Sequence, residues 1–412
     1  MAVTAAATGC PFDHQQTPIP AHVPPSAVYD YDYLSSLSDS GSHAECARAL
    51  RDNAGEIFWT PRNGGHWIVQ GAELSVRMLR DTELFSSHPD YNKTRRFATM
   101  LLPSQVDPPA HTDYRRALSP VFSPGNMRKI EPDIRAIATG LIDKIQPQGK
   151  CEFVSEFAEY FPIAIFLSLV GAPMSDRDEL LRYAGNYTRS SNREIRSVAT
   201  EDLARYIRGL SERRGADAAD NMLTQVAKLG AQGRELTQEE LDGLGVQLFV
   251  AGLDTVKSAI SFIILHLARN PDHYARLVAD PELIPAGIEE LLRISGPSNP
   301  ERGVTRDLED YAGVALKKDD RIVFILPLAG FDPKLNEDSY TVDFDREASQ
   351  HLVFGTGVHR CAGSHLARIE VRVLLEEWTK RFPTFRVDPD DSPEITKGGT
   401  VWTAARVPLA WP

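Results

Sequence analysis

The feature that most constrains the fold is a long stretch of helical periodicity that begins at Thr237 and runs to Arg269. Thr237 and Glu240 have the spacing of a capping box, and Pro271 follows shortly after the stretch ends. At the standard rise per residue, such a helix is roughly 50 Å long. In a soluble protein a helix of this length is normally the central rod of an α-helical fold, so we expect the rest of the chain to pack around it.

Helical periodicity also dominates elsewhere, from about residue 71 to residue 295. A last long helix is expected from near Cys361 to around Lys380. Residues 1–27 are rich in Ala, Pro and polar residues and are expected to form an extended N-terminal arm. Because no internal repeat and no low-complexity linker is visible, we expect residues 28–412 to form a single domain.

Strand signals are fewer and shorter than the helical ones. In residues 56–70 two β-prone runs flank Asn63-Gly64-Gly65, which is a hairpin signal. Short strand-like runs such as Arg321–Leu326 lie between residues 300 and 345, and Phe385–Pro412 reads as strand and turn. The sequence therefore predicts a mainly α fold with a smaller β-rich part.

Charge and cysteine content exclude several classes of protein. The 412 residues include 45 Lys and Arg against 57 Asp and Glu, so the formal net charge is −12. An acidic chain is a poor partner for nucleic acid or an anionic membrane surface. The four cysteines (Cys10, Cys46, Cys151 and Cys361) are scattered, which argues against structural zinc and a disulfide framework. The N-terminal residues lack the regions of a secretory signal, so we expect a cytoplasmic protein with reduced thiols.

Residues 354–363 carry the chemistry of the chain. They read Phe-Gly-Thr-Gly-Val-His-Arg-Cys-Ala-Gly and lead directly into an amphipathic helix. Gly355, Gly357 and Gly363 let the backbone turn tightly and approach a flat ligand closely. Cys361 lies at the helix entrance, where unpaired N–H groups and the helix dipole favour a thiolate, which is a good iron ligand. A lone cysteine after a Gly-rich turn is more often a plain buried side chain, but here the whole pattern points to a metal-binding loop.

This segment resembles the haem-binding loop of the cytochromes P450, the haem-thiolate monooxygenases. Matching motifs run from about Asp107 to Gly363, and a weaker similarity extends nearly end to end. Among the subfamilies the chain is most similar to the bacterial camphor-hydroxylase group, with shared phrases at Gly252–Val256, Leu316–Asp319 and Pro408–Trp411. The resemblance implies a cytochrome P450 fold with haem b (heme b, iron protoporphyrin IX) between the long central helix and the loop, and Cys361 as the iron ligand.

Glu290 and Arg293 stand at i and i+3 on one helix face. Alone this is an ordinary surface pair. The resemblance implies a structural role, in which Glu290 and Arg293 pair with the downstream Arg346 to hold the core near the haem loop. Arginine suits this role because its planar fork can hold a carboxylate and backbone carbonyls together.

Asp254 and Thr255 lie in the middle of the long helix. A carboxylate there costs energy unless it has a partner. The Thr255 hydroxyl can bond the carbonyl of Ala251 and loosen the helix locally, and Gly252 allows a ligand to approach the backbone. A kinked helix with a satisfied polar pair is one interpretation. The resemblance favours another, in which Asp254 and Thr255 form the catalytic acid–alcohol pair that guides protons to dioxygen.

Four basic side chains match the haem-propionate contacts of the family: His111, Arg115, Arg302 and His359. His111 and Arg115 are at i and i+4 and share a helix face. Each residue alone would be read as a surface charge. Together, in this order, they offer charge-assisted hydrogen bonds to two carboxylates of one haem.

No flavin or iron–sulfur segment is visible in the chain. The resemblance therefore implies that electrons come from a ferredoxin and an NAD(P)H-dependent reductase. Such ferredoxins are acidic, so docking would need a local basic face on the cysteine side of the haem. The candidates are Arg77, Arg80, Arg115, Arg116 and Arg360. Scattered solvated arginines are nearly as good an interpretation.

The substrate is less constrained than the cofactor. Counting back from Asp107, Thr99 falls where the camphor enzyme has an anchoring tyrosine, so camphor itself is not expected. The expected substrate-binding residues are Thr99, Met100, Leu101, Gln247, Val250, Ala251, Thr400 and Val401. Mostly apolar walls with a few polar groups suit a small hydrocarbon skeleton such as a monoterpenoid or norisoprenoid. A small aromatic acid held by Arg95 or Arg96, with hydroxylation or demethylation, is the alternative.

Two further functions were weighed against a monooxygenase using dioxygen. A peroxygenase of the same fold would use hydrogen peroxide, but that class tends to lose the acid–alcohol pair that Asp254 and Thr255 provide. A non-catalytic haem sensor or gas carrier would need neither this pair nor a substrate pocket. The monooxygenase is the expected function.

Overall fold

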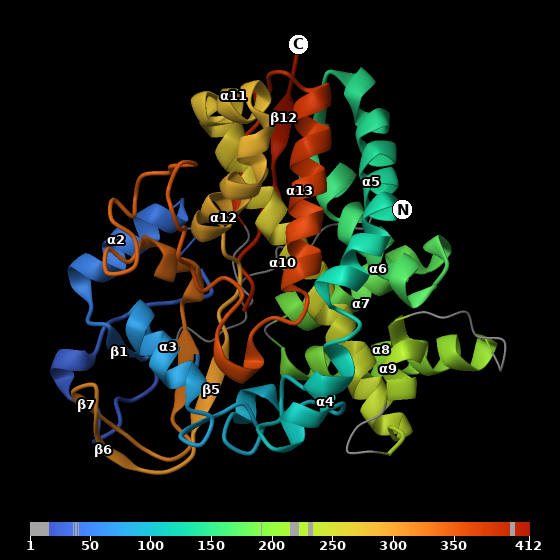
Figure 1. Ribbon diagram of the computed structural model, residues 1–412. Coiled ribbons are helices and arrows are strands. Elements are labelled where there is room, and N and C mark those ends of the chain that lie inside the picture. The colour runs from blue at the N-terminus through green and yellow to red at the C-terminus, as the bar shows by residue number, and fades with distance from the viewer. Residues whose placement is uncertain are drawn as a thin grey trace, which may run out of the picture.

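The computed structural model describes residues 16–35, 37, 39, 41–190, 192–214, 222–229, 234–395 and 400–412. Helices dominate it (Figure 1). The α-helices are α2 (His43–Asn53), α3 (Ala72–Arg80), α4 (Ala110–Leu118), α5 (Pro124–Ile145), α6 (Tyr160–Val170), α7 (Arg177–Arg189), α8 (Arg193–Arg214), α9 (Met222–Leu229), α10 (Gln238–Arg269), α11 (Pro271–Ala279), α12 (Ile284–Ile294) and α13 (Ser364–Arg381).

The strands are short and form several small sheets. They are β1 (Ile57–Thr60), β2 (His66–Val69), β3 (Phe85–Ser86), β4 (Lys150–Glu152), β5 (Glu301–Val304), β6 (Leu308–Tyr311), β7 (Val314–Leu316), β8 (Arg321–Phe324), β9 (Arg386–Val387), β10 (Glu394–Ile395), β11 (Ala404–Arg406) and β12 (Pro408–Ala410). The predicted mainly α fold with a smaller β-rich part is confirmed.

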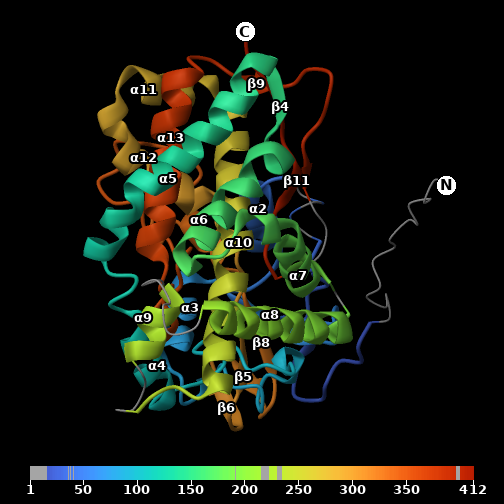
Figure 2. The same ribbon diagram turned by 90° about the vertical axis from the view of Figure 1, so that its right-hand side faces the viewer.

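Helix α10 is the central element. Thr237 caps it, because its hydroxyl accepts from the Glu240 N–H at 3.3 Å while the Glu240 side chain accepts from the Thr237 N–H at 2.7 Å. The predicted capping box is thus confirmed. Helix α10 packs against α6, α7 and α8, and Figure 2 shows α8 lying across it. It is long and apolar enough to cross a membrane, but 78% of its most apolar segment is buried inside the protein.

A five-stranded sheet in the order β1-β2-β8-β5-β3 lies beside the helices. Strands β1 and β2 form the predicted hairpin, and Asn63, Gly64 and Gly65 take left-handed φ angles of 53°, 86° and 72° in its turn. Strand β5 pairs antiparallel with β8 and β3. Strands β3 and β4 lie within the region where helical periodicity dominates, and they were not predicted because strands this short leave no alternation to read.

Helix α13 follows the Cys361 loop and fixes its position. It begins at Ser364, close to the predicted start. The buried Trp378 ring packs against Phe153, Phe157 and Phe382, at centroid distances of 5.3, 6.1 and 4.4 Å. Each such pair contributes about 0.5–1.5 kcal/mol beyond its area burial. The loop therefore starts from a helix that is anchored in the core.

Residues 1–15 of the expected N-terminal arm lie outside the described residues. The rest of the arm packs on the β1–β2 hairpin: the Thr17 N–H donates to the Pro61 carbonyl at 3.0 Å, and Val23 is buried. A single domain over residues 28–412 stays a prediction. Consistent with it, one apolar cluster contains Phe58 of the sheet and Trp378 of α13.

Candidate functional site

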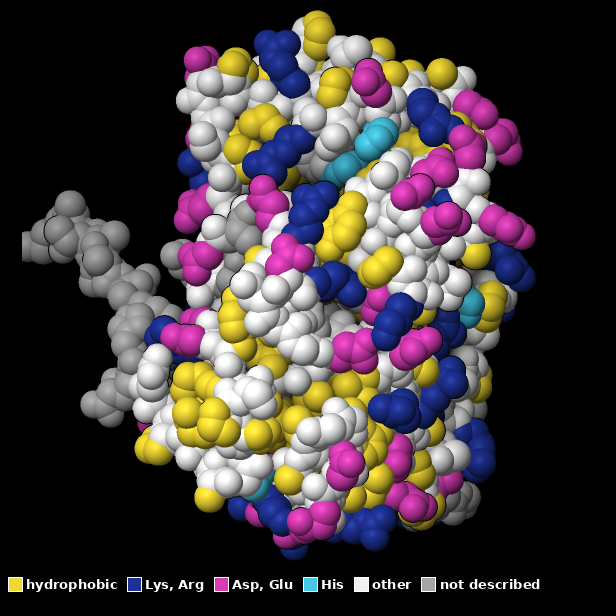
Figure 3. Space-filling view, turned by 90° about the vertical axis from the view of Figure 1, so that its left-hand side faces the viewer, with side chains coloured by type: hydrophobic (Ala, Val, Ile, Leu, Met, Phe, Trp, Pro, Cys, Tyr) yellow, Lys and Arg dark blue, Asp and Glu magenta, His cyan; other side chains and the backbone are white. Residues whose placement is uncertain are grey.

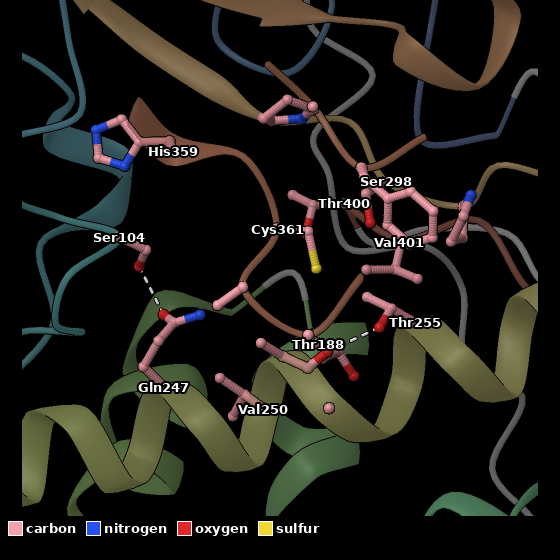
Figure 4. A pocket seen from close by; sticks show the side chains of 18 of the residues that line it. Ser104, Thr188, Gln247, Val250, Thr255, Ser298, His359, Cys361, Thr400 and Val401 are labelled. Carbon is pink, nitrogen blue, oxygen red and sulfur yellow. Dashed lines mark hydrogen bonds between the residues drawn. The ribbon is translucent and has the colours of Figure 1, made fainter. Parts of the chain in front are cut away.

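The Cys361 loop turns sharply between Phe354 and α13. Gly355 and Gly357 have φ angles of 65° and 69°, which residues with a Cβ rarely adopt. A Cβ on Gly357 would also lie 3.0 Å from the Leu79 carbonyl oxygen of α3. The Cys361 N–H donates to the Phe354 carbonyl at 2.8 Å. The sulfur points toward α10 (Figure 4), so the loop presents one thiol to the space beside the central helix.

The Cys361 side chain is exposed to this cavity, and protein atoms surround its thiol on the other sides. Burial raises its pKa, against the opposing effects of the Gly363 N–H and of the Arg115 and Arg360 guanidinium groups. The sequence predicted that the helix entrance would favour the thiolate, and in the protein alone burial outweighs that effect. A coordinated metal ion reverses the balance, because a coordinating thiol is deprotonated.

A cavity of about 800 Å³ separates the loop from α10. Ala251, Gly252 and Thr255 line it from the helix, and Phe354 and Cys361 line it from the loop. Apolar side chains dominate its surface. A mostly apolar cavity of this size with a few polar groups is typical of a ligand or cofactor site.

The four expected propionate-binding residues all line this cavity. The His111 and His359 rings lie 4.4 Å apart between centroids, and neither ring nitrogen of the buried His111 has a hydrogen-bond partner among the described residues. Arg302 is buried too, and its Nε has no partner there either. Arg115 donates to the Arg360 carbonyl at 2.8 Å.

The nearby Asp107 carboxylate, which lies 3.7 Å from His359 Nε2, does not balance the guanidinium groups of Arg115 and Arg302. Burial, followed by the charges of His359 and Arg115, lowers the pKa of His111 to about 4. Burial and the charge of Arg95 lower the pKa of Arg302 to about 10. Buried N–H groups without partners are costly. Two carboxylates would satisfy them, so the residues present fit a haem whose propionates lie here and whose iron takes Cys361.

The mid-helix polar residues face different ways. The Thr255 hydroxyl lines the cavity and donates to the Ala251 carbonyl at 2.7 Å, as expected. The Asp254 carboxylate does not line the cavity and pairs with Lys257 of the same helix at 2.7 Å. Lys257 is itself buried and lies 3.9 Å from the Glu159 carboxylate. The partner that Asp254 needs is therefore a neighbour on its own helix.

Glu290 and Arg293 are fully buried and form a bidentate pair at 2.7 and 2.8 Å. Arg293 also donates to the carbonyls of Gly330, Ser339 and Thr341. Arg346 lies 3.3 Å from the same carboxylate, which also accepts from the Asp343 N–H and the Ser349 hydroxyl. A Cβ on Gly330 would lie 2.3 Å from the Arg293 carbonyl. All three residues thus meet in one closed cluster.

The expected substrate-binding residues divide into two groups. Those on α10 and near the C-terminus line the cavity: Gln247, Val250, Ala251, Thr400 and Val401. Figure 4 shows most of them gathered around the Cys361 sulfur. Gln247 is held in place, because its Oε1 accepts from the Ser104 hydroxyl at 2.6 Å.

Thr99, Met100 and Leu101 do not line the cavity, which corrects that part of the prediction. Leu101 is fully buried in an apolar cluster, and Met100 is 37% exposed. The physical reason is a close approach to Gly243 of α10, where a Cβ would lie 2.3 Å from the Met100 carbonyl. The chain turns away at this contact, and the neighbouring residues Lys93, Thr94, Arg95, Pro103 and Ser104 line the cavity instead.

Several polar residues that line the cavity were not predicted, among them Glu370, Arg193, Arg196, Glu301 and Arg321. Glu370 of α13 is buried, and burial alone raises its pKa well above the usual range. The apolar neighbours of Glu370 on an amphipathic helix were a signal for this position. Arg193 and Arg196 of α8 also line the cavity. Helix α8 carries charges on most of its surface, so no pattern distinguished them.

Three comparisons agree on what this chain is similar to. A family model described as "Cytochrome P450" matches residues 151–408. "Probable cytochrome P450 127A1" of Sinorhizobium fredii is 35% identical over 410 residues, which cover 96% of this chain and 97% of that protein. The crystal structure of CYP101J2 has a TM-score of 0.88 at 32% identity, covering 96% of this chain and 100% of the other. That of CYP101C1 has a TM-score of 0.86 at 32% identity with the same coverage.

Proposed function

The chain belongs to the cytochrome P450 family of haem b monooxygenases and is similar to the camphor-hydroxylase group, and from that premise we propose that it hydroxylates a small, mostly apolar substrate. The observation that carries the proposal is the position of Cys361 across one cavity from Thr255. When haem b is bound, activation of dioxygen and transfer of one oxygen atom are the chemistry it supplies.

In this proposal Cys361 ligates the iron, and His111, Arg115, Arg302 and His359 hold the propionates. The unpartnered nitrogens of His111 and Arg302 support these roles. Glu290, Arg293 and Arg346 keep the loop in place through the buried cluster described above. Groups without hydrogen-bond partners in the described part of the chain are assigned to the haem, and groups that are paired with one another are assigned to the fold.

Protons reach the oxygen site through Asp254 and Thr255. The Thr255 hydroxyl faces the cavity and can hold a proton there, while Asp254 and Lys257 connect the helix to the partly exposed Glu159.

Electrons come from a ferredoxin and an NAD(P)H-dependent reductase. Arg77 and Arg80 of α3 lie beside the Cys361 loop, where Arg80 Nε donates to the Thr356 hydroxyl at 3.3 Å. Arg116 is 76% exposed. Arg115 is less suited to docking, because it lines the cavity and donates to the Arg360 carbonyl. Figure 3 shows Lys and Arg side chains along one edge of the face that carries α2 and α3, with Asp and Glu among them.

The substrate class that fits the cavity is a monoterpenoid or norisoprenoid. Val250, Ala251 and Val401 supply apolar walls of the cavity, and Gln247 and Thr400 supply polar groups. A small aromatic acid is the second candidate, and a specific observation favours it: Arg95 lines the cavity. Arg96 does not line it, is 55% exposed and pairs with Asp90 at 2.9 Å. We expect a cytoplasmic enzyme, in keeping with its buried α10.

An optical titration of the haem-loaded protein tests the proposal. Displacement of a distal water by the substrate shifts the Soret band to shorter wavelength, and we expect a saturable shift with monoterpenoids or ionones. Substrate-dependent oxidation of NADH should require ferredoxin, reductase and dioxygen. Turnover with hydrogen peroxide alone would favour a peroxygenase. Haem binding without the spectrum of a thiolate ligand, or unchanged in Cys361→Ala, would contradict the proposal.

A further inference from the structure

The cavity is strongly basic where α8 meets the loop that precedes α4. Arg95 comes from that loop, Arg193 and Arg196 from the first turn of α8, and Arg321 from β8. These four guanidinium groups line the cavity together with the carboxylate of Glu301, while the other acidic side chain of the cavity lining, Glu370, comes from α13. Of the two arginines that the sequence offers for an acid, Arg95 lines the cavity and Arg96 does not.

Glu301 cannot neutralise all four arginines, because its oxygens are already taken. Arg321 binds both of them, at 2.7 and 3.2 Å. The Tyr33 hydroxyl donates to one oxygen at 3.1 Å and the Thr94 hydroxyl to the other at 3.0 Å. Despite burial, the charges of Arg321, Arg95 and Arg196 hold the pKa of Glu301 well below its usual range. Glu301 is therefore an ionised partner of Arg321.

Arg95 and Arg196 remain without a carboxylate. Among the described residues no Asp or Glu lies within 4.0 Å of either guanidinium. The contact of Arg95 is the Ser104 hydroxyl at 3.5 Å. Arg196 lies over the rings of Phe97 and Tyr187, 4.9 and 5.2 Å from their centroids, and its buried Nε has no hydrogen-bond partner there. Both guanidinium groups line the cavity and both act on the nearby Glu301, and the planar fork of an arginine matches a carboxylate.

Such a carboxylate could belong to the haem or to the substrate. Arg95 lowers the pKa of both Arg302 and His359, so it lies near the propionate-binding residues. Arg196 instead acts on Glu301 and Tyr33. The four propionate-binding residues already provide a donor set for two propionates. A further pair of cations, one of them on α8, exceeds what the haem needs.

We propose that Arg95 and Arg196 form a subsite for a carboxylate of the substrate. The substrate is then a small apolar skeleton that carries one carboxylate, such as a terpenoid acid or an aromatic acid. This inference rests on the proposed function, because it assumes that the apolar part of the same molecule lies beside Cys361 and Thr255. The Ser104–Gln247 pair on the cavity wall would contact the middle of such a molecule.

Matched ligands test this subsite by binding alone. Haem-loaded protein is titrated calorimetrically with geranic acid and its primary amide, and with 4-methoxybenzoic acid and its amide. In the wild type at least one acid should bind roughly 10- to 100-fold tighter than its amide, since hydrogen bonds to a charged group are lost. Arg196→Gln should remove most of that preference and leave amide binding within about 2-fold. Arg196→Lys should restore part of it, because the charge returns without the fork.

Arg96→Gln is the matched control, because Arg96 is adjacent in sequence, exposed and outside the cavity. It should leave the acid-to-amide ratio unchanged. The rate of haem transfer to apomyoglobin shows whether Arg95 binds a haem propionate or the carboxylate of the substrate. If Arg95→Gln speeds haem loss and keeps the acid preference, Arg95 serves a propionate and the subsite as proposed is wrong.

The other possible results distinguish a failure of the carboxylate subsite from a failure of the proposed function. Equal binding of acid and amide by the wild type, or a Soret shift with ionones but none with either acid, overturns the carboxylate subsite and leaves the proposed monooxygenase intact. A protein without a haem-thiolate spectrum overturns the proposed function itself. Melting temperatures of the variants within about 3 °C of the wild type exclude misfolding as the cause.

Discussion

Two groups of buried charge in this protein differ in how they are compensated. The first, the Glu290 cluster, consists of Glu290, Arg293 and Arg346, and its carboxylate and guanidinium groups bind one another and nearby carbonyls. The second, the cavity cations, consists of the buried Arg302 and the half-buried Arg95 and Arg196, with the uncharged His111 among them. Several of their N–H groups have no partner among the described residues.

The contrast separates residues that serve the fold from residues that serve a ligand. A buried charge is expensive in water-free surroundings, and a protein normally compensates it internally. The Glu290 cluster follows this rule and needs nothing further. The cavity cations are an exception to this rule, and they come from several elements around one cavity. We therefore assign them to anionic groups that the folded chain itself does not provide.

The largest expected effect comes from breaking the closed cluster. Arg293→Met should lower the free energy of unfolding by about 3–5 kcal/mol, because it leaves the Glu290 carboxylate buried without its main partner. Urea unfolding measures this, and the loss should be the same with and without haem. Arg346→Met is the milder control, since Arg346 is 13% exposed and the Glu290–Arg293 pair survives. A loss confined to the haem-loaded protein would make this cluster part of the haem site.

Removing one of the cavity cations should have the opposite effects: little change in the stability of the apoprotein and a clear change in haem binding. Arg302→Met should leave the stability of the apoprotein unchanged or raise it by about 1 kcal/mol, because it removes a buried cation that lacks a partner at Nε. Loss of one charged contact to a propionate should speed haem dissociation roughly 10- to 100-fold. Haem transfer to apomyoglobin measures the rate. If Arg302→Met lowered the free energy of unfolding of the apoprotein by more than about 2 kcal/mol, Arg302 would serve the fold and not the haem.

Much of the Glu290 cluster and of the haem loop could be predicted from sequence. The spacing of Glu290 and Arg293, the capping box at Thr237 and the glycines around Cys361 are local patterns whose geometry is fixed within a few residues. Each rule relies on hydrogen bonds or backbone angles that neighbouring residues determine. The resemblance to a known family then supplied Arg346, which no local rule connects to Glu290.

The rest of the cavity depends on contacts between distant segments. Counting along the chain placed Thr99 to Leu101 at the substrate, but the contact of Met100 with Gly243 turns that segment away. Arg196 enters the cavity because α8 crosses α10, which a helix with charges on most faces does not reveal. The pairing of Asp254 with Lys257 follows the i, i+3 spacing on one helix face, so this contact could have been predicted from the sequence.

The stability of the apoprotein should also depend on pH, by a smaller amount, through the His111 ring, which is unpaired among the described residues. The pKa of His111 is about 4 in the folded protein against an ordinary 6.5, so the unfolded chain takes up the proton first. Its contribution to stability is therefore complete above pH 6.5 and is lost as pH falls toward 4. His111→Phe should recover about 1 kcal/mol of that loss between pH 7 and pH 5, a figure reduced for solvent screening.

His43 is the control for this prediction. Its pKa is also lowered to about 4 by burial, but its Nε2 has a partner in the Gly296 carbonyl at 2.8 Å. Bound haem should raise the pKa of His111, whose nitrogens would meet a carboxylate, and leave that of His43 unchanged. Unfolding curves at several pH values, with and without haem, separate the two. An equal response of both histidines to haem would remove the distinction between satisfied and unsatisfied groups.

The smallest effects on stability are expected where charge is exposed, and there only partner binding should respond. Arg116 is 76% exposed beside Asp113, so Arg116→Glu should change the free energy of unfolding by less than about 0.5 kcal/mol. Combined with Arg77→Glu it should slow reduction by ferredoxin roughly 3- to 10-fold at low salt, because opposite charges on the two proteins steer their encounter. The difference should shrink as salt screens the charges.

Arg205→Glu, which reverses a 71% exposed arginine on α8, is the matched control. Stopped-flow measurements give the reduction rates of the wild type, the double variant and the Arg205→Glu control. Equal rates for all three would mean that the ferredoxin docks without Arg77 and Arg116, and that exposed arginines near the loop have no special role in docking.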